Sequence, residues 1–295
     1  MGDYVVSCSA PADLTAEYMK KREISFVPFH FELGGKEYLD DMGQSMPMDE
    51  FYRKMTEGAM TRTSQVSAGE YESYFEEFLK QGLDVIHLTL SSGISGTINS
   101  ALVAKESLLE RYPDRKLYVI DSLAASGGFG LLVDTVATKR DEGLSVDELA
   151  EWTEENKLRL HHWFFTTDLT YLVRGGRVSK VSGFVGNVLN ICPLLNVDYQ
   201  GRLIPRYKIR TKKKVIQAML ERMKEHAEGG IFYNQKVFVN DSDCRGDSDE
   251  LCRLIRETFP NIDGEIFQNS IGTTIGSHTG PGTVALFFWG DKRVD

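Results

Sequence analysis

The stretch "DVIHLTLSSGISGT", residues Asp84–Thr97, contains the pattern that decides the fold of this chain. It opens with a near-continuous apolar run ending at Leu90, which is typical of a strand buried in a parallel sheet. A turn rich in serine and glycine follows, and from Gly96 to Pro113 apolar residues recur at helical spacing. The stretch therefore predicts a strand, a turn and a helix, the repeating unit of parallel α/β sheets.

The same alternation extends on both sides of this stretch. β-branched and aromatic runs predict strands, and amphipathic or capped segments predict helices. The predicted strands cover residues 4–7, 24–31, 84–90 and 116–122, and the predicted helices cover residues 67–82, 96–113 and 127–140, with another helix capped by Ser145 and Glu148. Repeated strand–helix alternation predicts a parallel, doubly wound sheet, so we assign residues 1–160 to an N-terminal α/β lobe.

The pattern changes after about Leu160, because a hairpin now appears among the predicted strands. The hairpin turns at Gln200–Gly201, where glycine can supply the positive φ that such turns require. Further strands are predicted over 161–167, 236–242, 265–270 and 283–289, and helices over 168–176, 211–226 and near 247–259. This mixture predicts an α+β lobe, to which we assign residues 161–295.

Composition excludes several classes of protein. The formal net charge of −9 argues against nucleic-acid binding, which needs many phosphate-neutralising cations. No apolar run approaches the roughly 20 residues of a membrane span, so we expect no stable membrane insertion. The start of the chain shows no secretory signal pattern, and the cysteines lack CxxC spacing. We therefore expect a cytoplasmic protein without a metal site or disulfide framework.

The Ser/Gly turn is the first candidate site. It lies beyond the carboxyl end of a predicted strand, where open α/β sheets bind ligands, and it leads into a helix whose free N–H groups suit an anion. Ser95 is expected at or near the helix N-cap, beside Gly96. Plain capping of the helix, without any ligand, explains the same residues.

The turn also permits two enzymatic interpretations. A serine hydrolase places its nucleophile in G-x-S-x-G, but here Thr97 occupies the place of the second glycine. A triad of Ser95, His278 and a carboxylate remains an alternative, because triads are defined by geometry and not by chain order. A doubly wound enzyme that binds a nucleotide or sugar phosphate is another alternative, although no Walker loop is present.

Two further polar segments are predicted to be loops. "RTSQVS", residues 62–67, carries Thr63, Ser64 and Gln65 before a capped helix, a composition typical of solvated turns. "GSHTGPGT", residues 276–283, surrounds His278 with glycines that allow a ligand to approach closely. His278 could donate a hydrogen bond to a carboxylate, or it could be structural.

A basic series forms the fourth candidate. It comprises Arg174 and Arg177, followed by seven Lys or Arg within residues 202–214, among them Arg210. Most of these side chains are explained by a solvated hairpin. The alternative is a docking face for an acidic partner or for a phosphate-bearing molecule.

Taken in order, these segments resemble the DegV family, whose members bind fatty acids and partner a bacterial fatty acid kinase. The resemblance covers essentially the whole chain. The matching motifs are "TSQ" (Thr63–Gln65), "SSGISGT" (Ser91–Thr97), "VIDS" (Val119–Ser122), "LVRGGRVS" (Leu172–Ser179) and "GSHTGPGTVAL" (Gly276–Leu286). Each motif alone is unspecific, whereas the ordered set is highly specific.

The resemblance implies a carrier, not an enzyme, with a long-chain fatty acid in a tunnel between the lobes and no cofactor. Its carboxylate would be bound by Thr63, Ser95 and His278 and presented to a separate fatty acid kinase. Secondary site residues would be Ser64, Gly96, Arg174, Arg177 and Arg210. The sequence departs from the family pattern at Cys8 and Cys192, where Asp and Lys are common, which puts the electrostatics of the head group in question.

Overall fold

The parallel strands of the first half pair in one sheet. In the computed structural model, which describes residues 4–179 and 191–294, its order is β2-β1-β6-β7. The strands are β1 (Tyr4–Ser9), β2 (Ile24–Val27), β6 (Asp84–Thr89) and β7 (Leu117–Asp121). Successive side chains of a strand point to opposite faces, so Val85 and Ile86 pack into two different apolar clusters. Both faces of the sheet are therefore buried.

Helices cover both faces of this sheet, as the alternation predicted. One face packs against α3 (Ala68–Leu79) and α4 (Thr97–Arg111), and the other against α5 (Ser126–Asp141) and α6 (Val146–Asn156). Smaller elements at this end are η1 (Ala10–Ala12), α1 (Ala16–Lys21) and η2 (Lys157–Arg159). The predicted cap of Ser145 with Glu148 is present as a capping box, and Ser67 with Glu70 forms another at the start of α3.

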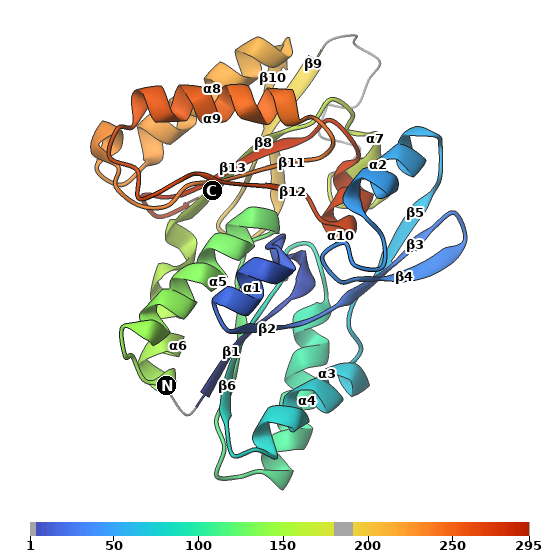
Figure 1. The fold of residues 1–295 in the computed structure, drawn as a ribbon, viewed down its shortest axis with the longest axis vertical. Helices are drawn as coiled ribbons and strands as arrows, with labels where there is room; N and C mark the ends of the chain where they lie inside the picture. Colours follow the sequence, from blue (N-terminus) through green and yellow to red (C-terminus); the bar gives the residue numbers. More distant parts are fainter. Residues whose placement is uncertain (1–3, 180–190, 295) are drawn as a thin grey trace.

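The second half forms a mostly antiparallel sheet of order β10-β9-β8-β13-β11-β12, in which only the β11–β12 pair is parallel. The strands are β8 (Leu160–Phe165), β9 (Ile191–Val197), β10 (Leu203–Arg210), β11 (Phe238–Asp241), β12 (Phe267–Ser270) and β13 (Val284–Trp289). Figure 1 shows α8 (Lys212–His226) and α9 (Arg245–Thr258) along its outer side. The short η4 (Gly230–Phe232) follows α8 in the chain. The predicted α/β fold class, with an α+β second half, is confirmed.

The single strand predicted over residues 24–31 is two strands, because the chain leaves the first sheet at Pro28. Proline has no N–H to donate and a fixed φ, so the ladder ends at Val27. The chain continues in a small antiparallel sheet of order β4-β3-β5, made of β3 (Phe29–Leu33), β4 (Lys36–Asp40) and β5 (Thr61–Ser64), with α2 (Met48–Thr56) inserted before β5. This insertion had no predicted counterpart.

Helix α5 lies between the two large sheets and contacts strands of both. Its first turn begins Ser-Gly-Gly, and these glycines leave no room for a side chain. A Cβ on Gly127 would lie 2.1 Å from Asn240 Oδ1, and one on Gly128 would lie 2.3 Å from His162 Nε2. The second sheet thus rests directly on the α5 backbone.

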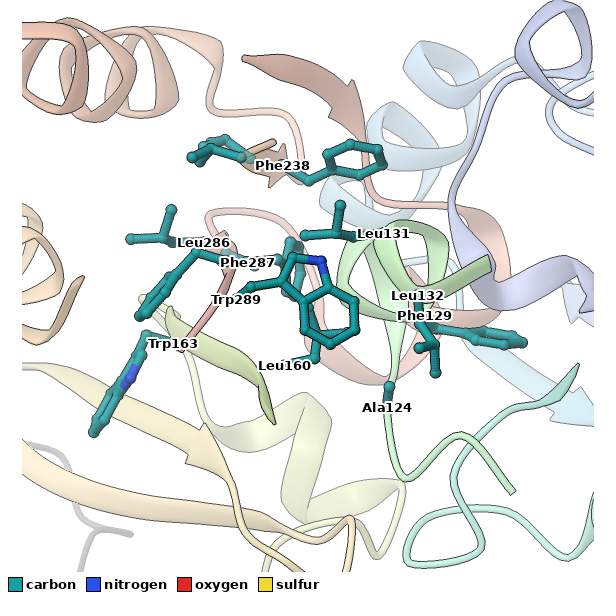
Figure 2. Close-up of a cluster of buried hydrophobic side chains, with 14 of the residues drawn as sticks. Ala124, Phe129, Leu131, Leu132, Leu160, Trp163, Phe238, Leu286, Phe287 and Trp289 are labelled. Atoms are coloured by element: carbon teal, nitrogen blue, oxygen red, sulfur yellow. The ribbon is translucent and has the colours of Figure 1, made fainter. Parts of the chain in front are cut away.

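The core continues through α5 from one sheet to the other. In Figure 2, Phe129 and Leu132 of α5 lie on one side of the β13 side chain Phe287, and Trp163 and Leu286 lie on the other. A predicted lobe boundary near residue 160 coincides with the start of β8 and stays a prediction. Within residues 4–179 and 191–294, no helix has both the length and the apolar character needed to cross a bilayer.

We expect Gly128→Ala to lower the free energy of unfolding by about 1–3 kcal/mol, because the added methyl group overpacks the contact with His162. Gly69→Ala is the matched control, since Gly69 also lies in a first helical turn but has nothing within 4 Å of its Cβ position. Alanine there should raise the free energy of unfolding by about 0.4–1 kcal/mol. Urea titration of both variants measures the difference, and equal effects would contradict this account of α5.

Candidate functional site

A cavity of about 590 Å³ lies between the two sheets. Its walls come from the loop after β6, from α5 and from strands of the other two sheets, and most of the lining surface is apolar. The apolar lining residues include Phe29, Leu90, Ile94, Phe164, Leu172, Val197, Leu203, Ile271, Ile275 and Phe287. The volume falls within the range of about 300–1,000 Å³ that is usual for small-molecule sites.

Hydrogen-bonding side chains gather on one part of the cavity wall. Thr63 reaches it from β5, and His278 reaches it from α10 (Thr273–Thr279). Thr63 Oγ1 lies 2.8 Å from His278 Nε2, which is hydrogen-bond distance. The ring of His278 fits because residue 175 is glycine, where a Cβ would lie 2.2 Å from Nδ1. Close packing of α7 (Thr170–Arg174) and its terminal glycine against α10 therefore sets the position of the imidazole.

Ser95 lies on the Ser/Gly turn that enters the same cavity. Its N–H donates to Ser91 O at 3.0 Å, and its Oγ accepts from the Thr97 N–H at 3.3 Å. The N-cap of α4 is Gly96, one residue after the predicted position. The tip of the β9–β10 hairpin of the second sheet fixes the turn, because Ser91 Oγ donates to Gly201 O at 2.8 Å.

Arg177 brings a positive charge to this part of the wall. The residue is half-buried, and its Nε donates to Ile94 O at 3.2 Å while Nη1 donates to Gly175 O at 2.5 Å. Burial lowers the pKa of the Arg177 guanidinium, but an arginine stays protonated at neutral pH. The guanidinium links the Ser/Gly turn to the end of α7 and favours an anion in the cavity.

His278 is neutral at pH 7 in this environment. Its pKa is lowered from 6.5 to about 4, first because burial disfavours the charged ring and second because Arg177 repels it. A neutral imidazole has one N–H donor and one acceptor nitrogen. The site therefore combines one cation with neutral hydrogen-bonding groups.

The structure brings most of the predicted site residues together. Thr63, Ser64, Ser95, Gly96, Arg177 and His278 all line the cavity. Thr63 and His278 were predicted to lie on loops, which is wrong, because backbone pairing with β3 places Thr63 on a strand and α10 contains His278. Arg174 and Arg210 are exposed and do not line the cavity. Arg174 instead lies over the ring of Tyr171, at 5.5 Å.

Other lining residues were missed by sequence reasoning. His162 and Phe164 of β8, Ser126 of α5 and Thr274 of α10 carry no motif. The sequence offered one signal for them, the alternation of side chains along β8. Alternation shows which residues share a face of the strand, but it does not show what packs against that face. Cys8 and Cys192, the two departures from the family pattern, are buried and do not line the cavity.

The fold and the cavity define a class: a mixed α/β protein enclosing an apolar cavity whose wall carries a group of hydrogen-bonding side chains and an arginine. The particular family follows from comparison. Residues 7–291 match the family described as "Uncharacterised protein, DegV family", and the chain belongs to the DegV family.

Known relatives match along the whole chain. A DegV domain-containing protein of Clostridium perfringens is 38% identical over 99% of both chains. A protein of Thermotoga maritima named "Fatty acid-binding protein" is 32% identical over 93% of both chains. The solved structure of the Streptococcus pneumoniae Fatty Acid Kinase B3 protein, loaded with linoleic acid, superimposes with a TM-score of 0.84 at 25% identity, covering 99% of this chain and 100% of that one.

The lowered pKa of His278 predicts a pH dependence of stability. The unfolded chain binds a proton below about pH 6.5, whereas the native state resists it down to about pH 4. Stability contributed by neutral His278 is therefore fully present above pH 6.5 and is lost as the pH falls toward 4. Between pH 7 and pH 4.5, the wild type should lose about 2 kcal/mol more than His278→Gln, since one pKa unit is worth about 1.4 kcal/mol. Urea titrations at both pH values measure this difference, and equal losses would contradict it.

Proposed function

We propose that this protein binds a long-chain fatty acid in the cavity between its lobes and holds the carboxylate at Thr63, Ser95 and His278. One observation carries the proposal: the hydrogen-bonded Thr63–His278 pair and Arg177 lie in the wall of a large, mainly apolar cavity. The names of the Thermotoga and pneumococcal relatives, which state fatty-acid binding and a linoleic acid ligand, support it.

The physical chemistry of a fatty acid fits this division of the cavity. Each CH₂ group gains about 0.8 kcal/mol when it leaves water for an apolar site, so a long chain binds strongly to a wall of aliphatic and aromatic side chains. A buried carboxylate is heavily penalised unless it receives hydrogen bonds. In this proposal the hydroxyls of Thr63 and Ser95 donate those bonds.

Arg177 and His278 have different roles in the proposal. The Arg177 charge compensates the carboxylate, and its attachment to Ile94 O holds the Ser95 turn beside it. His278 donates its Nε2–H to Thr63 Oγ1, which leaves the Thr63 hydroxyl proton for the ligand. A neutral histidine can do this without adding a second buried charge.

Presentation of the carboxylate to a separate fatty acid kinase is the second part of the proposal. The cavity wall next to Ser95 includes exposed residues, Ser64, Gln65, Ser92 and Gly96, through which a partner could reach the head group. The name of the pneumococcal neighbour supports such a partner. The phosphoryl-transfer groups would then belong to the kinase.

Hydrolysis by Ser95 and His278 is not favoured by the geometry. Ser95 Oγ accepts from the Thr97 N–H, and His278 Nε2 pairs with Thr63. Among the described residues, no hydrogen bond joins Ser95 to His278 or His278 to a carboxylate. A nucleophile needs its base within hydrogen-bond reach. Labelling of Ser95 by a fluorophosphonate, abolished in His278→Ala, would overturn the carrier proposal.

The proposal predicts that Thr63→Val and Ser95→Ala each weaken fatty-acid binding by one to two decades in Kd. Each variant removes a hydrogen bond to a charged group, worth about 1.5–3 kcal/mol. Calorimetric titration of delipidated protein with palmitate measures the change, and mass spectrometry of denatured protein identifies any lipid that co-purifies.

Thr61→Val is the matched control for this experiment. Thr61 precedes Thr63 by two residues on β5, but its hydroxyl donates to Ser277 O and the residue does not line the cavity. Its palmitate affinity should equal that of the wild type. Equal affinity of Thr63→Val, Ser95→Ala and the wild type would refute the assigned head-group site.

A further prediction concerns the kinase. Arg174 is exposed beside the head-group end, so Arg174→Glu should slow phosphorylation of bound palmitate by a fatty acid kinase while its palmitate affinity is unchanged. The wild-type rate should fall with added salt more steeply than the variant rate, because surface charges are screened over about 8–10 Å. Identical rates for both proteins at low salt would exclude Arg174 from the docking surface.

A further inference from the structure

Strand β8 contributes side chains to both faces of the second sheet. Its residues His162 and Phe164 line the proposed fatty-acid cavity. Its residues His161 and Trp163 line a separate groove of about 380 Å³ on the opposite face. Alternation of side chains along a strand requires this division. The hairpin β9–β10 divides in the same way, with Val197 and Leu203 at the cavity and Asn196 and Tyr207 at the groove.

Positive charge predominates in this groove. Four cationic side chains line it, against two carboxylates and two histidines. The cations are Arg206, Arg222, Lys292 and Arg293, the carboxylates are Glu225 and Asp291, and the histidines are His161 and His226. Glu225 pairs with Arg222 at 2.5 Å, and Asp291 pairs with both histidines. With the histidines counted as neutral, four cations against two carboxylates still leave the lining with a formal charge of +2.

Two residues that line the groove each carry a buried hydrogen-bond donor that has no partner within residues 4–179 and 191–294. The donors are the indole Nε1–H of Trp163 and the Nε–H of Arg293, in side chains of residues that are only 4% and 5% exposed. The remaining nitrogens of Arg293 are occupied, since they donate to carbonyl oxygens such as Val197 O and Leu123 O. Buried polar atoms are nearly always hydrogen-bonded. Because both free groups are donors, the missing partner is an acceptor.

We propose that this groove is a second ligand site, which binds the phosphate group of a small molecule. A phosphate oxygen accepts from Trp163 Nε1–H and Arg293 Nε–H, and the charges of Arg222 and Lys292 compensate the anion. Phosphate suits the groove because it offers several acceptor oxygens to donors that come from different elements. The site lies across the second sheet from the cavity, so it does not depend on the proposed fatty-acid binding.

The same groove contains a potential cation site, which the ring geometry disfavours. Nitrogen atoms of His161 and His226 lie 2.9 and 3.2 Å from Asp291 Oδ1. The two imidazole rings, however, are stacked at 4.8 Å with planes only 19° apart. Their in-plane lone pairs therefore run in nearly parallel planes and do not converge on one ion.

The test is a titration of the ¹⁵N-labelled protein with pyrophosphate, followed by the indole N–H signal of Trp163 in NMR spectra. Trp163→Phe assigns that signal. We expect a saturable shift, because the N–H gains an acceptor, and sodium chloride at equal ionic strength should not reproduce it. Arg222→Gln and Lys292→Gln should each weaken pyrophosphate binding about tenfold or more, which corresponds to one lost charge-assisted hydrogen bond.

Arg253→Gln is the matched control, because Arg253 is an arginine of α9 that pairs with Glu250 and Glu257 and does not line the groove. Its pyrophosphate affinity should equal that of the wild type. Three results would overturn the proposal: no saturable shift, equal weakening in Arg222→Gln and Arg253→Gln, or a shift produced by zinc and not by pyrophosphate. Palmitate affinity, measured in parallel, reports on the other cavity and is independent of these outcomes.

Discussion

The close contact between the first turn of α5 and the second sheet is the constraint on which the rest of the structure depends. Gly127 and Gly128 allow Asn240 and His162 to touch the helix backbone, so the sheet sits as near to α5 as a helix surface permits. The N-terminal end of α5 also forms part of the cavity wall, because Ala125 and Ser126 line the cavity. The distance between α5 and the second sheet, which bounds the cavity, is therefore set by residues that have no side chain.

The chemistry of the cavity depends on which of its side chains are charged. Arg177 is the cation beside the Ser/Gly turn, and its carbonyl partners hold it without neutralising it. Burial and the same arginine keep His278 neutral, so that the imidazole acts through hydrogen bonds. An anion placed there gains an opposite charge and several donors, whereas a neutral ligand would leave the guanidinium uncompensated. The charge and the donors of the cavity wall therefore favour an anionic ligand over a neutral one.

The second sheet uses both of its faces. An antiparallel sheet often leaves one face to water, but here one face borders the cavity and the other is partly covered by α8, beside which the groove remains open. Trp163 and Phe164 are neighbours on one strand and belong to different sites. This arrangement places two chemically different surfaces, one mainly apolar and one cationic, a single strand apart.

The sequence by itself determined the strands and helices of the parallel sheet in the first half, the change to hairpins after Leu160 and the motifs that carry Thr63, Ser95 and His278. These follow from local periodicity, capping and turn chemistry, which involve neighbours along the chain. Only the tertiary structure decided that Pro28 sends the chain into a separate sheet, that His278 lies on a helix, and that Arg177 faces the cavity while Arg174 does not. Those outcomes depend on contacts between residues far apart in sequence, such as Gly175 with His278 and Ser91 with Gly201, whose energies no local pattern records.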